Sequence, residues 1–299
     1  MKIGTIAQHV NIGPTRPDSI VTNTIPGRLN DFPIWTWWDF TDATAVGGGS
    51  APNPMVQFGV ELDFLQTLTG SDDKGPYDAD LITDDSGKGP SWYPDGGQDN
   101  YSYIQSVGPG VEYMQFTNPA NLSYRNFTII MILDKDTTTN SDYNESLYRI
   151  QSSGRVINAY TQKNSNTLLV LGNGFGHFRI YEDFWSNTNG GDTNNNFNWI
   201  ALTLNTSTNK IDLYSRGKLI TPDTDSGTMP DMDIASGATS VILGDDEQTA
   251  DVDESLSPGL KLYEMLIYEQ SLTAQQLQSI DLYVKNKYSS YPYGRINGY

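Results

Sequence analysis

The 299-residue sequence contains no cysteine and only two histidines, His9 and His177. Without cysteine there is no disulfide framework, no thiol nucleophile and no zinc–thiolate site. Neither histidine lies in a G-x-S-x-G or H-E-x-x-H pattern, so the sequence offers no hydrolase triad and no zinc-protease helix. We therefore assign no catalytic, cofactor-binding or metal-binding residue and predict a protein that is not an enzyme.

Long apolar runs are also absent. The longest purely apolar run, Ile129–Leu133, is far shorter than the ~20 residues that a membrane-spanning helix needs. The first 19 residues lack the apolar core of a signal peptide. We expect a soluble protein that is made in a cytoplasm and has no membrane partner.

Positive charge is scarce: 36 acidic residues against 18 basic ones give a formal charge of −18. Such a surface repels phosphate backbones, which argues against nucleic-acid binding. Metal cations or basic surfaces are the favoured counter-charges, although acidity can also simply keep a protein in solution.

Calcium is the one cofactor that the sequence leaves open. Carboxylates gather in the segment Gly244–Glu254, and hard oxygen ligands at this density suit Ca²⁺, although the spacing is not that of an EF-hand. The acidic residues of the segment are Asp245, Asp246, Glu247, Asp251, Asp253 and Glu254, with Asp134 and Asp136 as a weaker second cluster.

Alternating apolar residues predict many short strands. Trp199–Leu204 and Lys210–Ser215 read as a half-buried antiparallel hairpin around the turn Asn205–Asn209, and Phe127–Leu133 as a central strand buried on both faces. Further strands are expected at Met55–Leu65, Val111–Phe116, Leu147–Ile150, Val156–Tyr160, Thr167–Leu171, Gly176–Tyr181, Val241–Gly244 and Leu260–Tyr268.

A single helix is predicted near the end of the chain. Thr273 followed by Gln276 forms a capping box, and Leu277, Ile280 and Val284 fall on one face. We expect this helix, within Ser271–Lys287, to pack on the outside of a β-sandwich.

These motifs together resemble the laminin-G-like, concanavalin A-like jelly-roll family. The resemblance is carried by the hairpin within Asn198–Ile220, by Val241–Gly244, by the strand Leu260–Tyr268, by the closing helix and by Trp38–Phe40 with the following Thr41-Asp42-Ala43. It implies an all-β jelly-roll sandwich with an extended N-terminal arm and a C-terminal helix. We predict an arm at 1–34, the jelly-roll domain at 35–288 and an aromatic tail at 289–299.

The same fold class includes retaining β-glucanases, whose motif E-x-D-x-x-E is similar to the segment from Glu61 through Asp63 to Gln66. A retaining mechanism needs two carboxylic acids, one of which protonates the leaving oxygen. Gln66 replaces the second one, and an amide cannot transfer that proton. Likewise Gly172–Gly176 lacks the following Lys-Ser/Thr of a phosphate loop and reads as a turn.

Candidate glycan-binding groups are Trp92 and Tyr93, which lie inside the long polar segment Thr69–Asn100, and the loop Asn187–Asn196. That segment reads as a surface excursion. Strand alternation places Trp35 and Trp37 on one face and Trp38 and Phe40 on the other. We expect one of these faces to enter the core, and the alternative is that these rings form a sugar-stacking platform.

The function most consistent with these features is that of a virion structural protein of a tailed bacteriophage, decorating the capsid. Its arm would bind the major capsid protein or another virion protein, and homo-oligomers are possible partners in such a particle. The alternative is a carbohydrate-binding module or adhesin that recognises cell-surface glycans.

Overall fold

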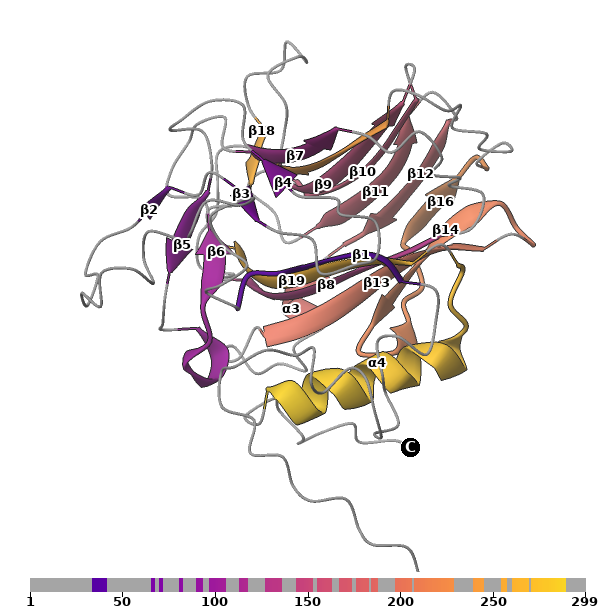
Figure 1. Cartoon of the computed structure of the whole chain (residues 1–299). Coiled ribbons are helices and arrows are strands. Elements are labelled where there is room, and N and C mark those ends of the chain that lie inside the picture. Colours follow the sequence, from indigo (N-terminus) through magenta and orange to yellow (C-terminus); the bar gives the residue numbers. More distant parts are fainter. Residues whose placement is uncertain are drawn as a thin grey trace, which may run out of the picture.

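The computed structural model shows an all-β protein made of two stacked sheets with one long helix at the C-terminal end (Figure 1). The residues that the structure describes are 34–41, 66–67, 70–71, 81–82, 90–93, 97–105, 113–117, 127–135, 144–152, 155–162, 167–173, 176–182, 184–187, 197–205, 207–228, 239–244, 254–256, 260–268 and 270–288.

The first sheet carries the helix on its outer face. Its strands run in the order β15-β14-β13-β8-β19-β6-β5-β2, and β1 pairs with β19 on the same edge as β6. All of its described pairs are antiparallel. The strands are β1 (Ile34–Asp39), β2 (Gln66–Thr67), β5 (Ser91–Tyr93), β6 (Tyr103–Gln105), β8 (Thr128–Lys135), β13 (Phe197–Asn205), β14 (Lys210–Ser215), β15 (Lys218–Leu219) and β19 (Leu260–Tyr268).

The second sheet runs in the order β16-β12-β11-β10-β9-β17-β7-β4-β3. One further strand, β18, pairs with β9, and this is the single parallel pair among the described strands. The strands are β3 (Gly70–Ser71), β4 (Leu81–Ile82), β7 (Tyr113–Thr117), β9 (Asn144–Ser152), β10 (Arg155–Thr161), β11 (Leu168–Asn173), β12 (His177–Tyr181), β16 (Thr224–Ser226), β17 (Thr239–Gly244) and β18 (Glu254–Leu256).

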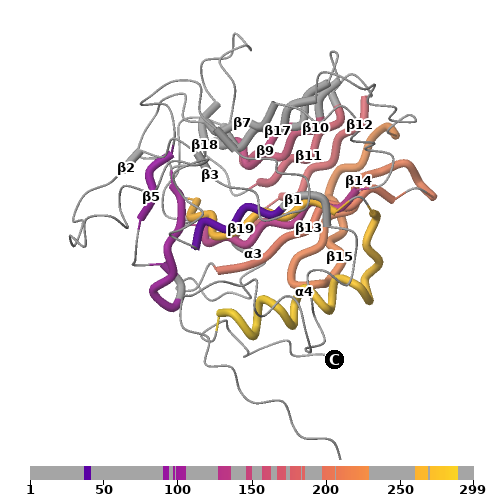
Figure 2. Tube along the Cα trace, in the orientation of Figure 1, coloured from indigo at the N-terminus to yellow at the C-terminus, as the bar shows by residue number. Residues whose placement is uncertain are grey.

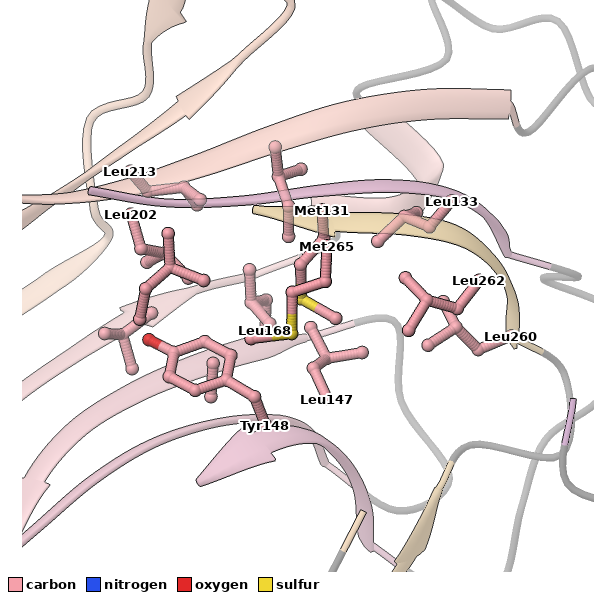
Figure 3. Packing of buried hydrophobic residues seen from close by; sticks show 14 of the residues in the cluster. Met131, Leu133, Leu147, Tyr148, Leu168, Leu202, Leu213, Leu260, Leu262 and Met265 are labelled. Atoms are coloured by element: carbon pink, nitrogen blue, oxygen red, sulfur yellow. The ribbon is translucent and has the colours of Figure 1, made fainter. Parts of the chain in front are cut away.

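The inner faces of the two sheets form the main core (Figure 3). Met131 and Met265 from the first sheet lie against Leu147 and Leu168 from the second, and all four side chains are fully buried. Each such burial contributes roughly 1.5–3 kcal/mol. The prediction of a central strand at Phe127–Leu133 is confirmed, because β8 lies between β13 and β19 and buries residues on both faces.

The predicted hairpin is confirmed as β13 and β14, which pair in the register Leu202 opposite Leu213. Asn209 adopts a φ of 51° to close its turn. The expectation of a half-buried pair holds for β14 alone. Along β13 both faces are buried, because the helix covers the side that alternation assigned to solvent.

The predicted helix is confirmed as α4 (Ala274–Lys287), which lies along the outer face of the first sheet (Figure 2). Thr273 and Gln276 form both hydrogen bonds of the capping box, and Leu277, Ile280 and Val284 are buried. The described residues also contain a short helix α3 (Phe184–Asn187) and a 3₁₀ turn η2 (Gln98–Asn100). None of the helices in the described ranges is long and apolar enough to cross a membrane.

The segment Thr69–Asn100 corrects one expectation. It was expected to be a surface excursion, yet it supplies β3 and β4 to one sheet and β5 to the other. Strands of two or three residues, held by pairing with a neighbour, leave no alternating pattern to detect. The arm before Ile34, the tail after Tyr288, the strand Met55–Leu65 and residues 188–196 lie outside the described residues, and the domain boundaries stay predictions.

Candidate binding site

Three tyrosines and a lysine form a patch on the outer face of the first sheet, at its β5–β6 end. We define the tyrosine patch as Tyr93, Tyr101, Tyr103 and Lys261. Tyr93 and Tyr103 are directly opposite each other in the β5–β6 pair, and their rings stack with centroids 4.8 Å apart and planes 8° apart. A cross-strand aromatic pair of this kind stabilises the sheet edge and fixes the orientation of both rings.

Strand alternation places these rings outward. The preceding cross-strand pair, Trp92 and Ile104, points into the main core. Trp92 is 3% exposed, and its Nε1 donates a hydrogen bond of 3.0 Å to the carbonyl oxygen of Phe40. The proposed role of Trp92 in sugar stacking is therefore wrong, because a ligand could reach this indole only by opening the core.

The tryptophans of β1 are buried as well. Trp38 and Phe40 lie in the main core, and Trp37 lies in the cluster between the first sheet and α4. The alternative of a sugar-stacking platform at Trp37 or at Trp38 with Phe40 is thus excluded by burial on both faces. The side chain of Trp35 is outside the described residues.

Polar groups flank the tyrosine patch. The Lys261 Nζ lies 5.0 Å from the centroid of the Tyr103 ring, a cation–π distance. The turn before Tyr101 holds Asp99 and Asn100 in the left-handed region, with φ of 53° and 62°, and Asn100 is exposed. Asn and Asp tolerate this conformation better than most residues.

Tyr101 fixes the other end of the patch. Its hydroxyl donates to the backbone carbonyl of Lys287 at 3.1 Å, and its ring meets that of Tyr288 edge to face. Burial raises the pKa of the Tyr101 hydroxyl, so this group stays a hydrogen-bond donor at neutral pH. Tyr93, Tyr101 and Lys261 each remain partly exposed.

This arrangement can bind a small polar ligand that also has an apolar face. Partly exposed aromatic rings offer apolar surface, and the nearby ammonium, amide and carboxylate groups donate and accept hydrogen bonds. The sequence pointed to Tyr93 but missed Tyr101, Tyr103 and Lys261. The alternation in Tyr101-Ser102-Tyr103 was the available signal, since it places both tyrosines on one side.

His177 has a structural environment. It is 2% exposed, its Nδ1 lies 3.2 Å from the carbonyl oxygen of Ser226, and its Nε2 accepts from the Ile211 backbone N–H at 3.4 Å. Burial and the nearby Arg179 charge lower its pKa, which favours the neutral ring. His177 is thus packed inside the fold, while His9 lies outside the described residues.

Arg179, two residues further along β12, joins the two sheets at their edge. Its Nη1 donates to the carbonyl oxygen of Ile211 at 2.6 Å and to Asp212 Oδ1 at 2.7 Å, both on β14. Its Nε donates to Asp225 Oδ1 on β16 at 3.3 Å. Lys210 Nζ binds the other oxygen of Asp225 at 2.7 Å. These bonds connect β12 to β14 and β16, so we assign this cluster to stability.

The remaining predicted sites are only partly described. Within the described ranges no group of three His, Asp or Glu side chains could hold a metal ion. Asp136 and Asp245–Asp253 lie outside those ranges, while Asp134 belongs to β8 and Glu254 begins β18, so the calcium site stays a prediction. Glu61 and Asp63 are likewise not described, and Gln66 begins β2. Gly172 pairs with His177 across the β11–β12 connection, as the predicted turn requires.

Comparison with known proteins shows the fold alone. No protein-family model and no curated protein sequence matches the chain. Among solved structures it is similar to the botulinum neurotoxin serotype D binding domain, with a TM-score of 0.50 and 14% identity over 84% of this chain and 51% of that one. It is also similar to the binding domain of Paraclostridial Mosquitocidal Protein 1, with a TM-score of 0.52 and 14% identity over 83% of this chain and 53% of that one.

The chain thus spans about half the length of these two structures. The matches support an all-β fold of the kind that these binding domains share. They give no support to a laminin-G-like or bacteriophage origin, which the sequence motifs had suggested.

Proposed function

We propose that this chain is a non-enzymatic binding module that recognises carbohydrate through the tyrosine patch. The observation that carries the proposal is the partly exposed Tyr93, which stacks on the buried Tyr103, with the partly exposed Lys261 beside that ring. The apolar face of a pyranose ring packs against an aromatic ring, and its hydroxyls accept from and donate to neighbouring polar side chains. Two proteins that share the fold are toxin binding domains, which supports a binding role over a catalytic one.

The charge of the chain limits the class of glycan that we expect it to bind. At a formal charge of −18 the protein as a whole repels anions, and the one cation in the tyrosine patch, Lys261, already lies over the Tyr103 ring. We therefore favour neutral over polyanionic glycans as ligands.

The test is a glycan array probed with the wild-type chain and two variants. Tyr93→Ala removes the outer ring of the stack and should abolish the signal, whereas Tyr93→Phe keeps the ring and should retain most of it. Tyr214→Ala is the matched control, because Tyr214 is a partly buried tyrosine of the same sheet at its opposite end. An array that stays empty for the wild-type protein, or binding that Tyr214→Ala loses and Tyr93→Ala keeps, would refute the proposal.

Attachment to a virus particle is a separate proposal, made on the sequence expectation of a leading arm at 1–34 and on the absence of a catalytic set. In that setting the arm would bind another virion protein and leave the sandwich facing outward. Deleting residues 1–34 should then abolish incorporation into purified particles while leaving the sandwich folded. Particles that incorporate the truncated chain normally would contradict it.

A further inference from the structure

Three charged side chains are buried together where β1, β19 and the end of α4 meet. Asp39 and Glu264 are 0% exposed, and the side chain of Lys287 is 3% exposed. The Lys287 Nζ lies 3.2 Å from both carboxylate oxygens of Asp39 and 2.9 Å from Glu264 Oε1. Asp39 and Glu264 are also direct partners in the β1–β19 register, so the lysine bridges two adjacent carboxyl groups.

Glu264 accepts hydrogen bonds from three side chains. Its Oε2 accepts from Trp37 Nε1 at 2.9 Å and from the Tyr283 hydroxyl at 2.8 Å, and its Oε1 accepts from the Tyr288 hydroxyl at 2.7 Å. Its Oε1 also lies 2.9 Å from Lys287 Nζ, a distance over which it can transfer protons to and from the amine.

Asp39 has different neighbours. Its Oδ1 accepts from the backbone N–H of Thr41 at 3.1 Å and from the Thr41 hydroxyl at 2.5 Å. Two donors that converge on one oxygen are the arrangement that stabilises an oxyanion on a tetrahedral carbon. When Asp39 carries a proton on Oδ2, these donors stabilise the negative charge that develops on Oδ1 as a nucleophile attacks.

Lys287 and Asp39 can exchange one proton. Burial lowers the pKa of Lys287, but the two carboxylates raise it by more, so the ion pair is the resting form. Because buried charges are costly, the pair also has a minor neutral form, in which an amine lies beside a carboxylic acid. A neutral amine is the nucleophilic form of lysine.

We propose that Lys287 and Asp39 become joined by an intramolecular amide bond, with Glu264 transferring the protons. The Nζ lone pair attacks Cγ of protonated Asp39, and the carbonyl electron pair moves to Oδ1, where Thr41 donates. Glu264 takes a proton from Nζ and returns it to the Oδ2 hydroxyl, which leaves as water. The Nζ–Cγ bond forms, the Cγ–Oδ2 bond breaks, and no oxidant, reductant or cofactor takes part.

The surroundings favour the amide over its hydrolysis. The rings of Tyr101, Tyr283 and Tyr288 lie 5.7, 6.0 and 5.6 Å from Nζ and shield it from solvent. Asp39, Glu264 and Lys287 are buried, and excluding water from the site suppresses the reverse step. The bond would tie the first described strand to the last helix covalently.

Intact-mass spectrometry of the denatured wild-type protein is the test. A cross-linked chain is lighter than its sequence by one water molecule, and digestion should yield a branched peptide that contains Asp39 and Lys287. The pair Lys210–Asp225 is an internal control, because its atoms are closer, at 2.7 Å, but partly exposed. Folded wild-type protein with the full sequence mass, or water loss that maps to Lys210–Asp225, would overturn the proposal.

Two variants test the roles of Glu264 and Lys287 in forming the bond. Glu264→Gln keeps the shape of the side chain but cannot transfer a proton, and Lys287→Arg keeps the charge but is no nucleophile. Both should have the full sequence mass. Water loss between residues 39 and 287 in Glu264→Gln would refute the proton-transfer role of Glu264. The wild-type mass decides the existence of the bond whether or not either variant folds.

Discussion

Replacing Arg179 by methionine should separate the two sheets at their β12–β14 edge. The substitution removes the guanidinium from the Ile211 carbonyl and from Asp212, whose side chain is 13% exposed. Removing one partner of a buried ion pair costs about 3–5 kcal/mol of the free energy of unfolding. Because Asp225 is 31% exposed and its pairing is screened by water, we expect a value at the low end, about 3 kcal/mol.

Lys210→Met is the matched control for this prediction. Lys210 pairs with the same Asp225 at the shorter distance of 2.7 Å, but its side chain is 25% exposed. An exposed pair contributes only about 0–1 kcal/mol, so this variant should remain close to the wild type.

The assay is urea unfolding of the three proteins at neutral pH, analysed by linear extrapolation with a shared slope. If the two variants lost equal stability, proximity alone would govern these ion pairs and the argument from burial would be refuted. A loss below about 1 kcal/mol for Arg179→Met would show that Arg179 does not hold the sheets together.

Three further predictions follow from described contacts. Burial raises the pKa of Asp225, but hydrogen bonds from Lys210 and Arg179 lower it by more, below 3.8, so it adds stability above that pH that is lost as pH falls through its folded value. Acid titration of unfolding should show a smaller loss in this range for Arg179→Met, and an unchanged loss would contradict the assignment. Thr273→Ala should cost about 1 kcal/mol through loss of the capping box, and Thr273→Ser should restore it in the same urea assay; equal losses would contradict the cap. Burial raises the pKa of Tyr181 to about 12, so its contribution to stability is complete below the ordinary pKa of 10.0 and disappears as pH rises toward 12; the phenolate absorbance of wild type compared with that of Tyr181→Phe would measure this, and ionisation of Tyr181 near pH 10 would refute it.

The long elements of this fold could be predicted from sequence because each has its own period. β8 contains a continuous apolar run, β13 alternates, and α4 shows both a cap and an apolar stripe. The sequence pattern of a strand could not show which of its faces another element covers. Alternation left one side of β13 to solvent, and only the position of α4 explains why Trp199 is buried there.

The candidate sites were harder to predict because they are assembled from distant segments. Trp92 and Tyr93 look equivalent as neighbours in sequence, yet pairing with β6 sends one inward and the other outward. Lys287 carried a usable signal, because it continues the apolar spacing of Ile280 and Val284 and a lysine on such a face needs a partner. Nothing in the sequence could identify that partner 248 residues away at Asp39.

The pairing of β1 with β19 has a consequence for biosynthesis. A strand that begins at Ile34 must wait for its neighbour, Leu260–Tyr268, which is translated more than two hundred residues later. At about 5–20 residues per second this delay lasts on the order of ten seconds or more. During that time the nascent chain exposes the apolar strand β8 without one of its two partners, so we expect synthesis to be the stage at which this protein most needs a chaperone.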